Sequence, residues 1–262
     1  MSEVQNVNNE NVEQRAPRKH TRTWYNRHMF RLLMEVYFQL KENNNVDGMD
    51  LTEEHFENIS LSVESLNEVT EDKLRFSIDS LCIHLRTLQA KGFIKLSAES
   101  KDIEDIKNMN ISLTLLGRNV VYILKDVKFT SIYRANPKHR QKDKVVSQHT
   151  KTFYNRHAVQ LLNLMLSENI EDFKEAKEES EDVSFEDYKW MDFSFEDLNE
   201  RVHYSEESLK LHLKYLENKN LIKTNEEDKY ELTEFGLVIG RVLKDIKYQS
   251  LYNIGAARLK KD

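Results

Sequence analysis

Four blocks of sequence occur twice in this chain, in the same order, and this internal repeat constrains the fold more than any other feature. Insertions fall only between the blocks, where loops tolerate extra residues at little cost. The chain is therefore predicted to contain two copies of one structural unit. The blocks His20–His28, Leu61–Val69, Ser77–Lys95 and Leu113–Tyr133 return as His149–His157, the segment that starts at Phe193, Ser205–Lys223 and Leu232–Tyr252.

The repeat divides the 262 residues into two units of ordinary domain size. We expect unit 1 at 20–134 and unit 2 at 149–254. Residues 1–19 are polar and lack periodicity, which predicts a disordered N-terminal arm. Residues 135–148 form a basic linker in this interpretation, and 255–262 form a C-terminal tail.

Each unit is expected to start with an amphipathic helix, because Phe30, Leu33, Tyr37 and Leu40 recur at helical spacing. Hydroxyl residues that favour helix N-termini then precede three further helices. Between the last two helices, short apolar segments predict a β-hairpin, so the expected fold is mainly α with small β-hairpins (α+β). The predicted N-cap residues are Ser62, Ser77 and Thr114 in unit 1 and Ser194, Ser205 and Thr233 in unit 2.

The third and fourth blocks contain the pattern S-x-x-S-L-x-x-H-L-x-x-L-x-x-K-x-x-I-K followed by L-T-x-x-G. This pattern resembles the recognition helix, wing and closing helix of ArsR-like and MarR-like winged helix-turn-helix repressors, and the resemblance covers most of both units. It implies two tandem winged-helix domains from an internal duplication, with each third helix in a major groove of double-stranded DNA. Winged helices also serve as protein-binding modules, so the pattern is more specific for fold than for function.

Outward positions of the third helices are the first candidates for DNA contact, since Ser, His, Arg and Lys donate to phosphates and base edges. The candidate residues are Ser77, Ser80, His84 and Arg86 in unit 1 and Ser205, Ser208, Lys210, His212 and Lys214 in unit 2. Ile83 and Thr87 are also expected to face outward. So are Asp79, Glu206 and Glu207, which would face phosphates but also complement the helix dipole. The repeated histidines lack partners at ligand spacing, so no metal is expected.

Basic residues outside these helices are further candidates. Arg27 and Arg156 lie in the repeated Tyr-Asn-Arg-His segment, which is either a phosphate clamp or a helix cap with Tyr25 or Tyr154 packed on the closing helix. The helix ends at 125–128 and 244–247 are expected to be solvated. The linker residues Lys138, Arg140, Lys142 and Lys144 either follow the DNA backbone or form an ordinary solvated linker.

The charge of the chain is segregated. Residues 168–197 contain 13 acidic residues and 3 lysines, whereas the whole chain has a net charge of −6. We expect this acidic insertion to form a solvated loop in unit 2, or to compete with DNA or bind a basic partner.

Catalytic motifs are not found: there is no Gly-rich phosphate loop, G-x-S-x-G or H-E-x-x-H, so neither an enzyme nor a cofactor is expected. The single cysteine, Cys82, excludes an internal disulfide. The N-terminus lacks the apolar core of a signal peptide, and no apolar run reaches membrane-spanning length. These features predict a cytoplasmic protein without a membrane partner, associated with the nucleoid if it binds DNA.

The leading interpretation is a sequence-specific transcriptional regulator whose two units act as a pseudo-dimer, each reading a half-site about one helical turn from the other. A plasmid or phage replication initiator is a close variant. The alternative is an architectural tandem winged-helix subunit that binds a protein, as on kleisins, and the acidic net charge favours it. Homodimerisation also stays open, because the closing helix has apolar residues beyond its buried seam, at Val121, Ile123, Phe129 and Ile132.

Overall fold

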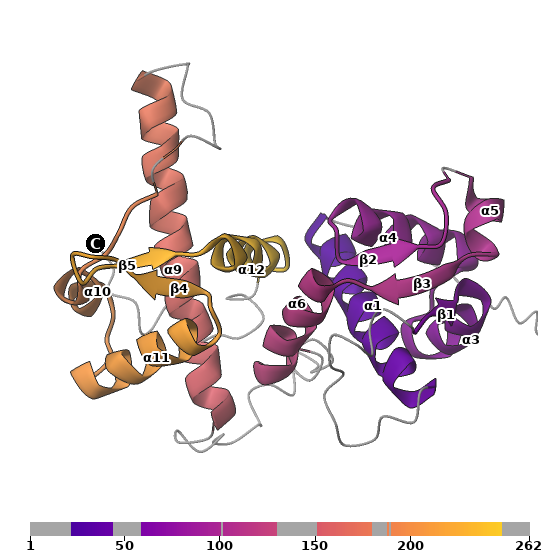
Figure 1. The fold of residues 1–262 in the computed structure, drawn as a ribbon, viewed down its shortest axis with the longest axis horizontal. Coiled ribbons are helices and arrows are strands. Elements are labelled where there is room, and N and C mark those ends of the chain that lie inside the picture. The colour runs from indigo at the N-terminus through magenta and orange to yellow at the C-terminus, as the bar shows by residue number, and fades with distance from the viewer. Residues whose placement is uncertain are drawn as a thin grey trace, which may run out of the picture.

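The computed structural model describes residues 22–43, 59–100, 102–129, 151–179, 188 and 190–247. The expected arm, linker and tail lie outside the described residues, and so do Lys138, Arg140, Lys142, Lys144 and Ile132. The described chain forms two halves, in which helices surround a small antiparallel sheet (Figure 1). The predicted class, mainly α with small β-hairpins, is confirmed.

The first half contains a three-stranded sheet of order β1-β3-β2. Neither β1 nor the short helix α5 was predicted: β1 adds a strand beside β3, and α5 occupies the long tip of the expected hairpin. The elements are α1 (Arg22–Asn43), β1 (Leu61–Ser62), α3 (Val63–Leu74), α4 (Ile78–Ala90), β2 (Ile94–Leu96), α5 (Ile103–Lys107), β3 (Asn110–Leu113) and α6 (Leu115–Asp126).

The second half repeats this order around a two-stranded hairpin. Phe193 makes an isolated bridge to Tyr230, at the place where β1 pairs with β3 in the first half. The elements are α9 (Lys151–Glu179), α10 (Phe195–Arg201), α11 (Glu206–Asn218), β4 (Ile222–Thr224), β5 (Tyr230–Leu232) and α12 (Glu234–Asp245).

All six predicted N-caps are confirmed. In each, the side-chain hydroxyl accepts a hydrogen bond from the backbone N–H three residues later, which satisfies a donor that the helix leaves unpaired. The third helices end as expected, because Gly92 and Asn220 adopt left-handed conformations with φ of 72° and 53°.

The L-T-x-x-G motif marks a close contact between the closing helix and the chain that leaves the third helix. A Cβ atom on Gly117 would lie 2.0 Å from the carbonyl oxygen of Phe93, and one on Gly236 would lie 1.9 Å from that of Leu221. Only glycine allows the two backbones to approach this closely. The same carbonyls accept hydrogen bonds from the backbone N–H groups of the capping threonines.

One continuous cluster of buried apolar residues extends through both halves. The predicted inner face of the first helix is fully buried, from Phe30 to Leu40. The expectation that Val121, Ile123 and Phe129 leave an apolar face for homodimerisation is wrong, since all three are buried within this chain. The contact of α6 with α9 joins the halves beside these residues.

The expectation of a solvated acidic loop at 168–197 is wrong for its described part. Helix α9 continues to Glu179, since its sequence here is rich in strong helix formers. Asn169 is fully buried and accepts a 2.6 Å hydrogen bond from the backbone N–H of Met191. Phe173 packs against the rings of Tyr188 and Trp190 at centroid distances of 5.0 and 6.2 Å. These nonlocal contacts fasten the returning chain to the helix.

Candidate nucleic-acid interface

The outward faces of α4 and α11 carry similar groups at two corresponding positions. Large aliphatic side chains are exposed at corresponding positions, Ile83 at 46% and Leu211 at 56%, and Leu115 is the only other exposed large hydrophobic residue among those described. One turn further along each helix, Arg86 and Lys214 are exposed basic residues, again at corresponding positions. Each face therefore combines an apolar and a cationic group.

A groove of about 870 Å³ follows the exposed side of α4. It separates this helix from the chain that leaves β2. Its lining comes from both segments: Ile83, Arg86, Thr87, Gln89, Ala90, Glu99 and Ser100. The predicted contact residues Ile83, Arg86 and Thr87 thus share one concave surface.

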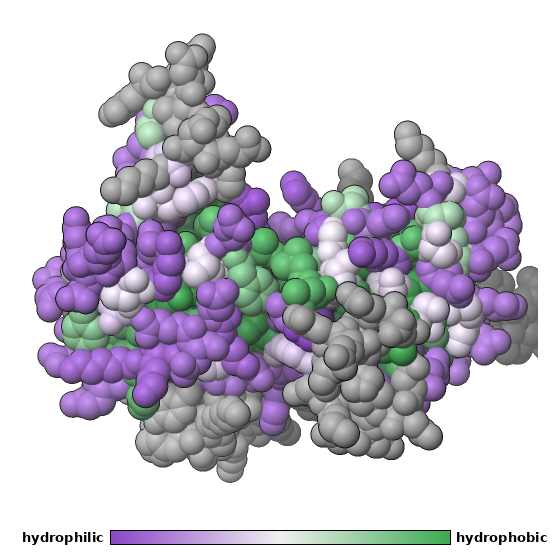
Figure 2. Space-filling view, in the orientation of Figure 1, coloured by the Kyte–Doolittle hydropathy of each residue, from purple (hydrophilic) through white to green (hydrophobic). Residues whose placement is uncertain are grey.

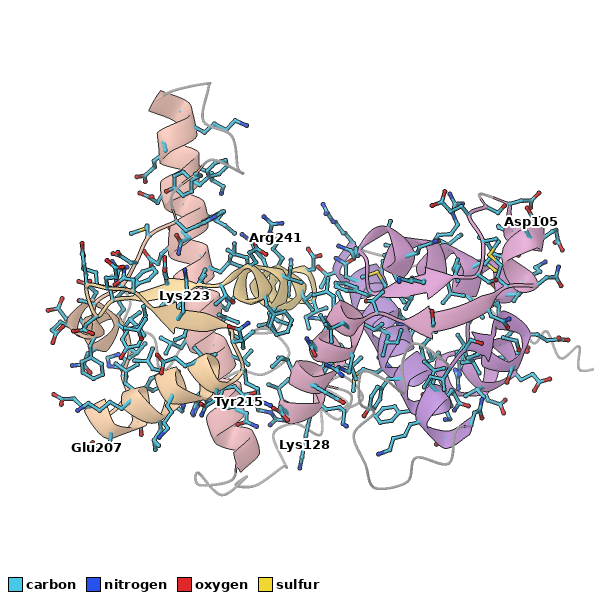
Figure 3. The ribbon with its side chains drawn as sticks, viewed as in Figure 1. Asp105, Lys128, Glu207, Tyr215, Lys223 and Arg241 are labelled. Carbon is cyan, nitrogen blue, oxygen red and sulfur yellow. The ribbon has the colours of Figure 1, made fainter. Side chains whose placement is uncertain are left out.

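Helix α11 has acidic residues at its outer end, as the sequence predicts. Glu206 and Glu207 are exposed, and Figure 3 shows Glu207 at one end of the helix and Tyr215 toward the other. Lys210 lies 4.0 Å from Glu206 and 5.4 Å from the centre of the Phe195 ring. The predicted donors of α11 therefore share their face with two carboxylates.

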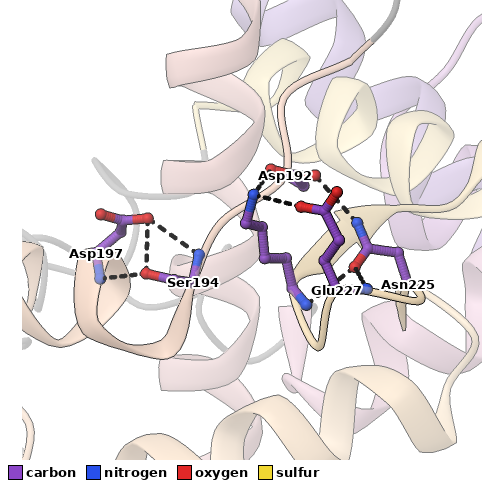
Figure 4. Close-up of polar contacts among 6 residues, drawn as sticks. Asp192, Ser194, Asp197, Asn225 and Glu227 are labelled. Carbon is purple, nitrogen blue, oxygen red and sulfur yellow. Dashed lines mark hydrogen bonds and ion pairs between the residues drawn. The ribbon is translucent and has the colours of Figure 1, made fainter.

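The exposed side of each hairpin continues the candidate interface. Lys95 and Lys223 are exposed at corresponding positions of β2 and β4, and Lys223 forms a 2.8 Å ion pair with Glu231. In the second half the hairpin turn is also tied to the acidic segment, since Asn225 donates to Asp192 at 3.0 Å (Figure 4).

Next to this turn, Ser194 and Asp197 form a capping box at the start of α10 (Figure 4). The hydrogen bond from the Ser194 hydroxyl holds the pKa of Asp197 below its ordinary value. Hydrogen bonding to Glu227 and the nearby charge of Asp192 raise the pKa of Lys229. The turn is therefore held by charged groups on both sides.

The expectation that His84 and His212 face outward is wrong: they are 3% and 1% exposed. Both follow a core leucine by three residues, so the helical period places them on the inner side. His84 packs against Tyr25 at 4.3 Å, and desolvation lowers its pKa to about 4. His212 packs against Tyr204 at 4.9 Å. Because both imidazole rings are buried, they cannot contact DNA in this conformation.

Arg27 and Arg156 have partners that the sequence did not reveal. Arg27 Nε donates to the Ile246 carbonyl oxygen at 2.8 Å, and Arg156 Nε donates to that of Val127 at 2.9 Å. Each arginine therefore caps the closing helix of the opposite half, where unpaired carbonyls and the helix dipole favour a cation. These contacts are helix caps, but they lie on the closing helix of the opposite half and not on the helix that the segment begins. Tyr25 donates to or accepts from the Thr87 hydroxyl at 2.8 Å, on the third helix.

The residues next to these arginines also contact the closing helix of the opposite half. Asn26 Nδ2 donates to the Asp245 carbonyl at 3.3 Å, and Asn155 Nδ2 donates to that of Asp126 at 3.5 Å. Lys91 and Lys219, at the ends of α4 and α11, pair with the carboxylates of Asp245 and Asp126 at 3.4 and 2.9 Å. We call these two sets of contacts the reciprocal clamps: Asn26, Arg27 and Lys91 on the end of α12, and Asn155, Arg156 and Lys219 on the end of α6.

The reciprocal clamps use helix ends that were expected to be solvated. The signal for them was in the sequence, because Asn-Arg and Lys-Asp recur at corresponding positions of both units. The sequence does not indicate that each Asn-Arg pair contacts the Lys-Asp pair of the opposite half. Figure 2 shows apolar side chains gathered near the middle of the molecule, around α12, with hydrophilic surface on the outer parts of both halves.

Within the described ranges, no group of three His, Cys, Asp or Glu side chains is placed to hold a metal ion. None of the helices in the described part of the chain has a stretch long and apolar enough to cross a bilayer. Comparison with protein-family models, with curated proteins and with solved structures gave no match to this chain.

Proposed function

We propose that this protein binds double-stranded DNA and acts as a transcriptional regulator, with its halves as two tandem winged-helix units and α4 and α11 as recognition helices. One observation carries the proposal: the outward faces of α4 and α11 are exposed and carry the same kinds of group at corresponding positions. The order of capped helix, hairpin and closing helix in both halves supports the winged-helix assignment.

The chemistry of these faces suits a major groove. Arg86 presents a guanidinium, the group that pairs best with the N7 and O6 atoms of guanine. Ile83 and Leu211 offer apolar surface to thymine methyl groups, and Lys214, at the position of Arg86, offers a cation to the same guanine atoms. Ser80 and Ser208 lie in the first turns of their helices, where hydroxyls and backbone N–H groups meet phosphate oxygens.

In this proposal each half reads one half-site, and the half-sites lie about one helical turn apart. The basic linker residues Lys138, Arg140, Lys142 and Lys144 would add contacts to the backbone between them. The same arrangement serves a replication initiator, which repeated binding elements beside the gene would favour.

Fluorescence anisotropy with random-sequence duplex DNA across a salt series tests DNA binding directly. We expect affinity to fall steeply with salt, because neutralising each phosphate releases condensed counterions. The variant Arg86→Glu/Lys214→Glu should bind at least about ten-fold more weakly and with a shallower salt slope. The matched control is Lys174→Glu/Lys177→Glu, which reverses two exposed charges on the C-terminal part of α9, away from α4, α11 and the reciprocal clamps.

Failure of monodisperse protein to bind at low salt would contradict the proposal. An equal loss in the control variant would show that net charge, and not the faces of α4 and α11, governs binding. The linker variant Lys138→Glu/Arg140→Glu/Lys142→Glu/Lys144→Glu measures the contribution of the linker by the same change in slope.

A second candidate is an architectural subunit that binds a protein through the same faces. Exposed Ile83 and Leu211 favour it, since apolar side chains beside acidic ones suit a partner with an apolar, basic surface. Co-purification of one stoichiometric protein free of nucleic acid, lost on Ile83→Asp/Leu211→Asp, would support this role over DNA binding.

A further inference from the structure

The reciprocal clamps show how the two halves are related in space. Residues 26, 27 and 91 of the first half contact the end of α12, while their counterparts 155, 156 and 219 in the second half contact the end of α6. Every contact of the first set thus has a partner in the second set that runs in the opposite direction.

This reciprocity distinguishes between two kinds of arrangement. If the halves followed each other by translation, one surface of the first would contact a different surface of the second, and no contact would be returned. A two-fold rotation instead places the same patch of both partners in one interface, so that residue i contacts j and j contacts i. The clamps fit the two-fold arrangement, with α1 against α12 and α9 against α6.

The clamps also orient α4 and α11. Lys91 and Lys219 are the C-cap residues of these helices, and both are fastened to the interface between the halves. The C-terminal ends of both helices therefore lie toward the centre and their capped N-termini lie away from it, on either side of α6 and α12 (Figure 1).

From this geometry, and resting on the DNA-binding role proposed above, we infer that the chain recognises an imperfect inverted repeat rather than a direct repeat or a single site. The two strands of a duplex are antiparallel, so a protein with two-fold symmetry meets the same sequence twice only when the half-sites are inverted. In each half-site, bases read by Arg86 or Lys214 lie nearer the centre than those beside Ser77 or Ser205.

The recognised DNA repeat is expected to be imperfect because corresponding positions of α4 and α11 hold different residues. Ile78, at the start of α4, corresponds to Glu206 at the start of α11. Arg86 and Lys214 differ as well, and only arginine has the planar fork for two hydrogen bonds to guanine. The half-sites should therefore agree in orientation but not in every base.

Selection from a pool of random duplexes of about 30 base pairs, long enough for two half-sites one turn apart, tests the inference with the full chain. The expected motif contains two inverted elements. The two selected half-sites are then placed in three duplexes of equal length: in inverted orientation, in direct orientation, and with one half-site scrambled. The inverted pair should bind at least about ten-fold tighter than either of the others.

Arg86→Ala and Lys214→Ala provide a matched pair of variants. Each should relax the selection at one base position, and the two positions should fall in opposite half-sites at equal distance from the centre. The inference would be overturned if both variants relaxed base selection within the same half-site. Equal binding of the inverted and direct duplexes would also overturn it, and so would selection of a single element. A chain that binds no duplex in the salt series fails the proposed function and this inference together, whereas a chain that binds but selects direct repeats overturns the inference alone.

Discussion

At the residue scale, the repeated Asn-Arg pair shows where prediction from sequence reaches its limit. A guanidinium donates equally well to a phosphate oxygen and to a carbonyl at a helix end, so the residue type could not separate the two alternatives. The position of the opposite half decides between them. Arg156 is only 7% exposed, which leaves little of its side chain to reach DNA.

Removal of these arginines should lower the stability of the protein to different degrees. We expect Arg156→Ala to reduce the free energy of unfolding by about 2–3 kcal/mol, the usual range for a charge-assisted hydrogen bond that leaves a buried acceptor unpaired. The more exposed Arg27 should cost about half as much on replacement by Ala. Urea denaturation measures both, with Lys174→Ala, an exposed residue of α9, as the control. Equal, small losses in all three would argue against the clamps.

The buried ring of His84 predicts a pH dependence of stability. Folded protein keeps this ring neutral down to a pKa of about 4, whereas the unfolded chain takes up a proton near 6.5, so protons favour unfolding between these values. Stability should fall by up to about 3 kcal/mol as the pH drops from 6.5 to 4, and no further on account of this group. The difference between wild type and His84→Phe, measured by denaturation at several pH values, isolates it. Parallel curves for the two proteins would contradict the prediction.

At the scale of elements, those with local signals could be predicted and those that depend on distant contacts could not. Hydroxyl caps and the left-handed residues Gly92 and Asn220 mark helix ends within a few residues, so these boundaries were predicted correctly. Strand β1 exists only because β3 lies beside it. The extension of α9 is fastened by Asn169 to a segment some twenty residues later, and charge pattern alone suggested a loop.

The close approach of the closing helix to the chain that leaves the third helix can be tested with a pair of glycines in α12. Gly236→Ala forces a Cβ against a backbone carbonyl, which cannot move aside, and should cost at least about 3 kcal/mol of stability. Gly240→Ala meets only the Leu166 side chain, at 2.6 Å, and should cost about 1 kcal/mol or less. Thermal unfolding compares them, and similar losses would show that this approach is not tight.

At the scale of the whole molecule, the repeat predicted two units but not their arrangement. Apolar residues of α6 and the segment after it extend beyond the predicted buried seam, which suggests a surface for a second chain. The structure buries these residues within one chain, beside the contact of α6 with α9. Periodicity reports which residues avoid water, and it does not report what covers them.

The clamps should hold the halves together without a covalent connection. A protease site in place of residues 135–148 allows the full-length chain to be cut after it has folded. We expect the two fragments to elute together on size exclusion at micromolar concentration, since the shared core and both clamps remain. In Arg27→Ala/Arg156→Ala the cut fragments should separate more readily. If the two fragments of the cut wild-type chain eluted separately, residues 135–148 alone would keep the halves paired.

The presence of both clamps in one polypeptide has a genetic consequence. In a dimer of identical chains every substitution appears twice, so a change that suits one half-site is imposed on the other. Here α4 and α11 are encoded separately, so a single mutation alters one proposed reading surface while the other stays as it was. Arg86 and its counterpart Lys214 already differ in this way. Under the proposed function, a chain built in this way can follow an operator whose two halves diverge one base at a time.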